Sequence, residues 1–134
     1  MIKPYPLAMI ICDAVWRDPH NGKMTILGTF GQILAPTFPL EMPRFAVLLT
    51  LTGGHGVVPI SFRLVDADES IDSLAQVETE IDFPDPLSVL ETVSFLDGVI
   101  FTQPGEYRLQ CFSGSEMVIE RRIMVFDGSA GDYQ

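Results

Sequence analysis

Basic residues are scarce in this chain, and their scarcity excludes whole classes of function. The 134 residues include 8 Lys and Arg against 18 Asp and Glu, which gives a formal net charge of −10 at pH 7. No basic cluster exists beyond the pair Arg121 and Arg122. Phosphate backbones and anionic membrane surfaces repel such a chain. We therefore expect neither a nucleic-acid partner nor a membrane partner.

Cysteines and long apolar runs are also few. Cys12 and Cys111 are the only cysteines and form no Cys-x-x-Cys pair, so we expect reduced, buried thiols, with a Cys12–Cys111 bridge as the alternative. No run approaches the ~20 apolar residues of a membrane-spanning helix. The apolar run over residues 7–12 is too short for the core of an export signal. These features predict a cytoplasmic protein.

What the chain does have is enough apolar material for a core, at 47% of its residues. We predict one domain over residues 1–126 and a flexible tail over 127–134. Charge is unevenly distributed, because residues 64–107 carry eleven acidic and no basic side chains, whereas residues 1–63 carry five basic and three acidic ones. An acidic face is therefore expected.

The dominant period along the chain is two. Over residues 77–83, Val, Thr, Ile and Phe alternate with acidic residues, which is typical of a strand with one face in the core and one in water. Similar runs, separated by turn signals such as Asn21-Gly22, predict about eight strands and no helix of normal length. The predicted strands span roughly residues 5–16, 24–34, 44–52, 57–66, 74–83, 88–96, 99–102 joined to 106–113, and 116–126.

Antiparallel strands with this alternation need a second sheet to cover their apolar faces. We therefore predict an all-β, two-layer antiparallel sandwich with Greek-key-like connections, and a small closed barrel is the alternative. The segment Gln103-Pro-Gly-Glu-Tyr107 resembles the start of a late strand in many immunoglobulin-like domains. The resemblance implies that the Tyr107 ring packs inward while its hydroxyl finds a backbone partner.

A wider resemblance rests on short segments spread over most of the chain. They are Ile11-Cys-Asp-Ala-Val15, Asp18, Gly22-Lys23, Ile26-Leu-Gly-Thr-Phe30, Phe38-Pro39, Leu64-Val-Asp-Ala-Asp68 and Pro104-Gly-x-Tyr107. In this order they resemble an uncharacterised bacterial family of short, single-domain β-sandwich proteins. The resemblance implies a bacterial, cytosolic, free-standing domain with no assigned activity, and it supplies no catalytic residues.

One group of residues suggests catalysis, because an imidazole can activate a thiol. It consists of Cys12, Asp13, His20 and His55. Alternation, however, places Cys12 on one strand face with the apolar residues 8, 10, 14 and 16, as expected of a small core residue. Both histidines fall in turns. An enzyme that uses Cys12 with a histidine is therefore only a second alternative, and we expect no enzymatic activity.

Asp13 lies on the opposite face of the same strand, among apolar residues at positions 7, 9 and 11. A carboxylate on an apolar stripe must find hydrogen-bond donors. We predict a structural role for Asp13, either at the Asn21-Gly22 turn or in a pair with Arg17 or Lys23.

Four aspartates suggest a calcium site, since carboxylate oxygens are preferred Ca²⁺ ligands. Asp66 and Asp68 follow one predicted strand, and Asp82 and Asp85 end a later one. An EF-hand loop is excluded because Ile71 stands where Gly is required. A Ca²⁺-responsive binding domain is thus the first alternative, against a solvated turn. Zinc pairs, phosphate loops and hydrolase motifs are absent from the sequence, so we expect no cofactor.

Apolar residues also occur where a sandwich would expose them. The Pro-rich connection over residues 34–43 has no periodic structure, so it either covers an open end of the core or offers a contact surface through Phe38, Leu40 and Met42. Alternation further turns Leu48, Phe112 and Met117 outward. Our leading hypothesis is a non-enzymatic module that binds a protein partner, or a second copy of itself, through an edge strand or this connection.

Overall fold

The structure is a computed structural model that describes residues 3–69 and 72–128. These residues form nine strands. Most of the predicted tail, residues 129–134, lies outside the described residues. The strands are β1 (Tyr5–Arg17), β2 (Met24–Thr29), β3 (Gln32–Ala35), β4 (Leu40–Thr52), β5 (Gly56–Asp66), β6 (Ala75–Phe83), β7 (Val89–Phe101), β8 (Gly105–Ser113) and β9 (Glu116–Asp127).

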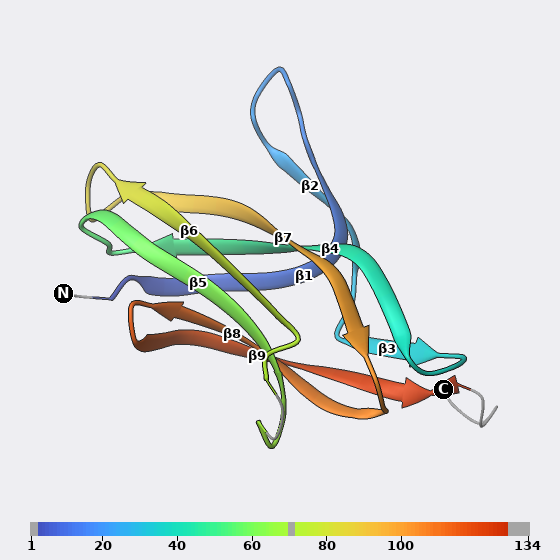
Figure 1. Cartoon of the computed structure of the whole chain (residues 1–134). Helices are drawn as coiled ribbons and strands as arrows, with labels where there is room; N and C mark the ends of the chain where they lie inside the picture. Colours follow the sequence, from blue (N-terminus) through green and yellow to red (C-terminus); the bar gives the residue numbers. More distant parts are fainter. Residues whose placement is uncertain (1–2, 70–71, 129–134) are drawn as a thin grey trace.

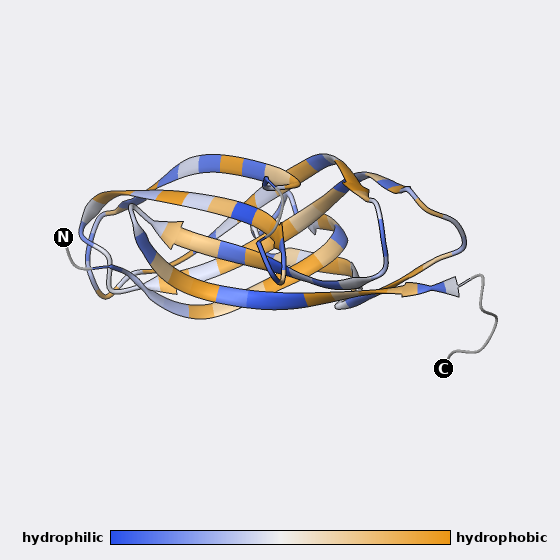
Figure 2. Ribbon diagram, turned by 60° about the horizontal axis from the view of Figure 1, so that its bottom comes forward, coloured by the Kyte–Doolittle hydropathy of each residue, from blue (hydrophilic) through white to orange (hydrophobic). Residues whose placement is uncertain are grey.

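The strands form two stacked sheets, which confirms the predicted immunoglobulin-like two-layer sandwich (Figure 1). Sheet A has the order β2-β1-β4-β7, and sheet B has the order β3-β9-β8-β5-β6. All pairs are antiparallel except β3 with β9, which run parallel from Gln32↔Met124 to Ala35↔Asp127. Figure 2 shows bands of high and low hydropathy alternating along the strands, as the period of two requires.

The core lies between the two sheets and is built from alternate residues of their facing sides. Sheet A contributes Met9 and Ile11 of β1 and the side chains at 45, 47, 49 and 51 of β4. Sheet B contributes alternate residues of β5, β8 and β9, such as Phe62, Leu109 and Ile123. These side chains are almost fully shielded from water, so their burial is the main stabilising contribution.

The predicted strand over residues 24–34 is two strands in the structure. β2 ends at Thr29, Phe30 packs against the core, and β3 begins at Gln32 in the other sheet. A ladder cannot continue across the gap between layers, so the chain breaks its pairing where it crosses. The crossing accounts for one strand more than predicted.

Residues 99–101 continue β7, so the predicted segment 99–102 is not joined to 106–113. They pair with the start of β4, where Met42 lies opposite Val99 and Leu40 opposite Phe101. Gly98 has a φ of 61°, a left-handed conformation that glycine adopts at little cost. The two strands curve together toward sheet B beyond this point (Figure 1), so Val99 and Phe101 enter the core.

The hairpin of β1 and β2 projects away from the rest of the molecule (Figure 1). Its turn is closed by hydrogen bonds from the Asp18 amide to the Lys23 carbonyl and from the Gly22 amide to the Asp18 carbonyl, each at 2.8 Å. The Arg17 guanidinium also donates to the Gly22 carbonyl at 2.9 Å. The predicted Asn21-Gly22 turn is therefore where the chain reverses.

Within the described residues, no helix is long and apolar enough to cross a membrane.

Candidate functional site

The four aspartates of the predicted calcium site lie at opposite ends of one hairpin. Asp66 ends β5, whereas Asp82 pairs with Val57 at the beginning of that strand. Nine residues of strand separate the two ends, which is roughly 30 Å. Asp68 follows Asp66, and Asp85 lies beyond Asp82 in a turn where its carboxylate accepts the Leu87 amide. The predicted four-carboxylate cluster is therefore not formed.

No group of three or more His, Cys, Asp or Glu side chains in the described part of the chain could hold a metal ion. The expectation of a shared site failed because an antiparallel hairpin brings together residues that are symmetric about its turn, not residues at its two ends.

The predicted thiol and imidazoles are also far apart. Cys12 pairs with Ala46 in the middle of sheet A, while His55 follows the far end of β4 and His20 lies in the projecting hairpin turn. Each histidine is separated from Cys12 by roughly 20 Å of strand. The Cys12 side chain is fully buried, and burial raises the pKa of its thiol, with a smaller contribution from the Asp13 carboxylate. This geometry offers no activated nucleophile.

Asp13 is exposed, and within the described residues it neither caps the Asn21-Gly22 turn nor pairs with Arg17 or Lys23 as predicted. Arg17 is engaged with the hairpin carbonyl of Gly22 instead. The Asp13 side chain occupies the space above Gly28 on β2, where its Cγ lies 2.9 Å from the place a Cβ would take. Asp13 thus stands where β1 leaves the sandwich for the projecting hairpin.

Tyr107 packs its ring in the core and directs its hydroxyl to the backbone. The hydroxyl donates to the Gln103 carbonyl at 2.7 Å, and the ring meets Phe101 edge-on with centroids 4.8 Å apart. Burial raises the pKa of this phenol. These contacts fix the start of β8 and provide no reactive group.

The Pro-rich connection covers the core. Phe38, Leu40 and Met42 are half-buried and pack against the core cluster. β4 already begins at Leu40, so the connection is shorter than the sequence suggested. These three residues therefore do not form the exposed apolar patch that a contact surface requires.

An apolar surface lies on the outer side of sheet A, and of its residues the sequence interpretation turned only Leu48 outward. Strand register places eight apolar side chains there, turned away from the core. We call them the apolar face: Ala8, Ile10, Cys12, Ala14, Ala46, Leu48, Val93 and Phe95. Each alternates with a core-facing residue of its strand, except Ala14 where β1 leaves the sandwich, and none belongs to the core cluster.

The relief of the apolar face is uneven. One row across the sheet runs Thr29, Cys12, Ala46 and Phe95. Cys12 and Ala46 are fully shielded from water, whereas Phe95 is 41% exposed. Leu48, in the neighbouring row, is only 5% exposed. A strip of small residues therefore lies beside a protruding aromatic ring.

A small polar rim closes one edge of the apolar face. Arg44 donates from Nε to Asp97 Oδ1 at 2.6 Å, and its guanidinium carbon lies 4.8 Å from the centre of the Phe95 ring. The ion pair raises the pKa of Arg44 and lowers that of Asp97. The apolar face continues into the projecting hairpin, where Trp16 is 52% exposed and Leu27 lies on the same side.

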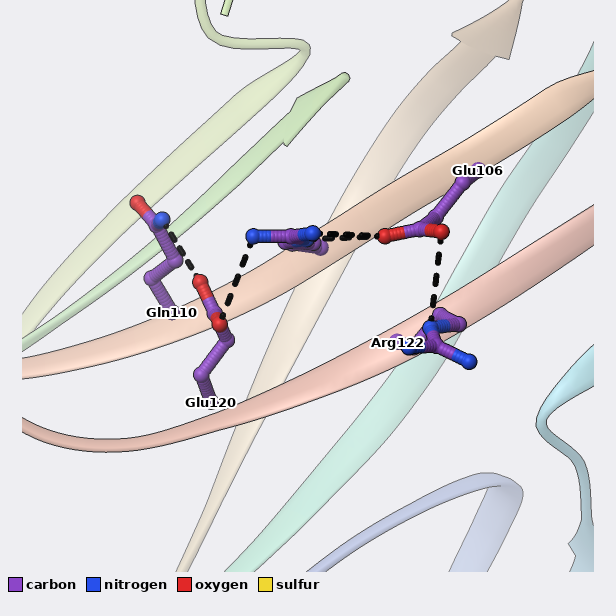
Figure 3. A network of polar contacts seen from close by, with 5 residues as sticks. Glu106, Gln110, Glu120 and Arg122 are labelled. Atoms are coloured by element: carbon purple, nitrogen blue, oxygen red, sulfur yellow. Dashed lines mark hydrogen bonds and ion pairs between the residues drawn. The ribbon is translucent and has the colours of Figure 1, made fainter. Parts of the chain in front are cut away.

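The outer side of sheet B has the opposite character. Glu106 bridges Arg108 and Arg122, and Arg108 also reaches Glu120, which accepts a hydrogen bond from Gln110 (Figure 3). On β6 the outward side chains at 78, 80 and 82 are all acidic and exposed. A shallow depression of about 460 Å³ lies over β5 and β6 beside them. Sheet B thus presents a charged, water-facing side.

The apolar face had a signal in the sequence. The segment over residues 8–16 is apolar at both parities of the alternation, and residues 46–49 are Ala, Val, Leu and Leu. In a two-layer sandwich only one side of a sheet meets the core. A strand that is apolar on both sides therefore indicates an uncovered apolar surface.

Comparison with known proteins finds one family. The profile of the Family of unknown function (DUF6941) matches residues 7–126. No curated protein matches.

Among solved structures, an immunoglobulin-like protein from Pseudomonas aeruginosa shares 14% identity with a TM-score of 0.36, over 92% of this chain and 97% of that one. A glycosyl hydrolase family 2 member from Bacteroides cellulosilyticus DSM 14838 shares 16% identity with a TM-score of 0.42, over 75% of this chain. This chain spans only 16% of the hydrolase.

Proposed function

Because the chain belongs to this family of unknown function, we propose its function from the properties of its surface. We infer that the protein is a non-enzymatic module that binds another protein through the apolar face. The supporting observation is the uncovered outer side of sheet A. Five of the eight side chains of the apolar face are at least partly exposed, Cys12, Ala46 and Leu48 are shielded between them, and no third layer of the described residues covers this side. An apolar surface of this kind commonly marks an interaction site.

The chemistry of the surface favours a protein partner. The apolar face has few charges, an aromatic ring at Phe95 and a guanidinium stacked on that ring. Aromatic and Arg side chains are enriched in protein interfaces relative to the rest of the protein surface. The same features suit neither phosphate nor metal recognition, and the aspartates and the thiol–imidazole group lack the geometry for the two alternative functions.

We also keep the proposal of a cytoplasmic location. Cys12 and Cys111 are both free and buried. Cys12 lies on the outer side of sheet A, whereas Cys111 lies in the core between the two sheets. Buried free thiols suit a reducing compartment.

Site-directed photocrosslinking in the native cell tests the binding surface. A benzophenone amino acid replaces Phe95 on the apolar face in one variant and Val57 on the outer side of β5 in a control variant. Both side chains are exposed, at 41% and 57%. We expect a discrete crosslinked product from position 95 and none from position 57. No product from position 95, or the same products from both, contradicts the proposal.

A further inference from the structure

We propose that the occupant of the apolar face is a second copy of this chain, packed face to face as a two-fold dimer. This inference rests on the proposed function and names its partner. It follows from three properties of the two outer surfaces: their charge, their relief and their extent.

Charge selects the side through which two copies can meet. The chain carries a net charge of −10, so most of its surface repels a second copy. On β6 the outward carboxylates at 78, 80 and 82 have no ion pair in the described residues, and two copies that met there would bring like charges together.

The outer side of sheet A is nearly neutral. Its outward positions include the charged residues Arg44, Glu91 and Asp97, of which Arg44 and Asp97 neutralise each other at 2.6 Å. Two copies can therefore approach through this side without apposing rows of carboxylates. Apolar sheet faces generally pack on one another about 10 Å apart.

The relief of the apolar face is suited to contact with itself. Phe95 protrudes at the end of a row whose middle residues, Cys12 and Ala46, are small and fully shielded. In a two-fold contact every interaction occurs twice, and each protrusion meets the corresponding strip of the other copy. The Phe95 ring of one copy can thus lie against the half-buried side chains that surround the Cys12–Ala46 strip of its partner.

The extent of the surface fits a dimer of ordinary size. Three strands that each span about nine residues in length, together with the shorter β2, cover roughly 500 Å² in projection at usual strand spacings. Side-chain relief brings the accessible area closer to the ~800 Å² per partner of a standard interface.

Sedimentation velocity of the full chain over a concentration series tests the dimer. We expect the fraction of dimer to rise reversibly as the protein concentration increases from about 1 to about 200 µM. The substitution Phe95→Ser removes one anchoring ring from each copy, at about tenfold each, and so weakens dimerisation by about 100-fold. The matched control Val57→Ser, exposed on sheet B, leaves dimerisation unchanged. Leu27 is exposed on the projecting hairpin, so Leu27→Ser is a second variant that should weaken dimerisation. Urea unfolding verifies that each variant is folded.

Salt provides an independent readout. A neutral apolar contact survives an increase from about 0.1 to about 1 M NaCl, whereas a contact between charged surfaces dissociates. A monomer at every concentration, a dimer that Phe95→Ser and Leu27→Ser leave intact, or a dimer that salt dissociates overturns the inference. If position 95 crosslinks only to a different protein in the cell, the second copy is wrong while the proposed binding surface stands.

Discussion

At the scale of single residues, Tyr107 shows how one side chain serves two purposes. Its ring fills the core next to Phe101, and its hydroxyl satisfies the Gln103 carbonyl. The resemblance of the Pro-Gly-x-Tyr segment to immunoglobulin-like domains implied an inward ring and a backbone partner for the hydroxyl, but it did not identify Phe101 or the Gln103 carbonyl.

Removal of the Tyr107 hydroxyl tests this bond. Tyr107→Phe keeps the ring and leaves the Gln103 carbonyl without its donor, so we expect the free energy of unfolding to fall by about 1–2 kcal/mol. Urea denaturation measures the difference. Tyr5→Phe is the control, because the Tyr5 side chain is 66% exposed. Equal effects of the two substitutions would contradict the role of the hydrogen bond.

Cys111 makes the stability of the fold depend on pH in the alkaline range. It lies in the core, where burial raises the pKa of its thiol from 9.0 to about 12. Between these values the unfolded chain releases the thiol proton and the folded chain retains it. The free energy of unfolding therefore falls as pH rises above 9, by up to about 1 kcal/mol per pH unit from this group.

Urea unfolding at pH 8, 9 and 10 measures this dependence. Because the pKa of Tyr107 and that of Cys12 are also raised, the informative quantity is the difference between the wild type and Cys111→Ala. We expect the variant to lose less stability over this range. Parallel pH profiles for the two proteins would show that Cys111 does not contribute.

Two residues of β1 show the limit of reading faces from alternation. The period of two separates Cys12 from Asp13 correctly, but it does not say which side meets sheet B. Met9 and Ile11 belong to the core, and Cys12 lies on the outer side. Asp13 shares the parity of the core residues and is still exposed, because β1 runs beyond the sandwich at that point. Face assignment depends on tertiary packing, which a single strand does not encode.

At the scale of elements, the turns and strands were predictable and the changes of sheet were not. The alternation in β5, β6 and β8 follows directly from their sequences. The break at Phe30-Gly31 and the continuation of β7 through Gly98 depend on which sheet each segment joins. Local sequence carries no signal for that choice, since β2 and β3 have similar composition.

Gly98 allows β7 to bend without ending, and a substitution there tests this role. Its φ of 61° strains any residue with a Cβ, although no atom lies within 4 Å of the position a Cβ would take. We expect Gly98→Ala to destabilise the fold by about 1 kcal/mol through backbone conformation alone.

The control for Gly98 is Gly31→Ala, whose Cβ would lie 3.4 Å from the flexible end of Arg121. We expect this change to stay within about 0.5 kcal/mol of the wild type. Thermal and urea denaturation of both variants give the comparison. A neutral Gly98→Ala would mean that the bend does not need a left-handed residue.

At the scale of the whole molecule, the sandwich has two unlike sides. Sheet A carries the apolar face, and sheet B carries ion pairs together with unpaired carboxylates on β6. The acidic segment that the sequence predicted, residues 64–107, includes β6 and β7, so one part of its charge lies on sheet B and another on the rim of sheet A. A charge count along the chain therefore predicted an acidic protein without locating the acidic side.

Screening of this excess charge should stabilise the fold. An increase from about 0.05 to about 0.5 M NaCl weakens repulsion among the carboxylates, so we expect the free energy of unfolding to rise by roughly 1 kcal/mol. Urea unfolding at the two salt concentrations measures the change. In the triple variant Glu78→Gln, Glu80→Gln, Asp82→Asn, the salt response should be smaller. If the variant and the wild type gain the same stability from salt, the repulsion arises from carboxylates other than these three.

The parallel pairing of β3 with β9 has a consequence for synthesis on the ribosome. β3 leaves the ribosome early, but its ladder partner among the described strands is β9, the last of them in sequence. All four strands of sheet A are available once β7 has emerged, whereas β3 and one edge of β8 remain unpaired until β9 emerges. A nascent chain that stalls before residue 116 therefore carries two unsatisfied strand edges, and emergence of β9 is the step that closes sheet B.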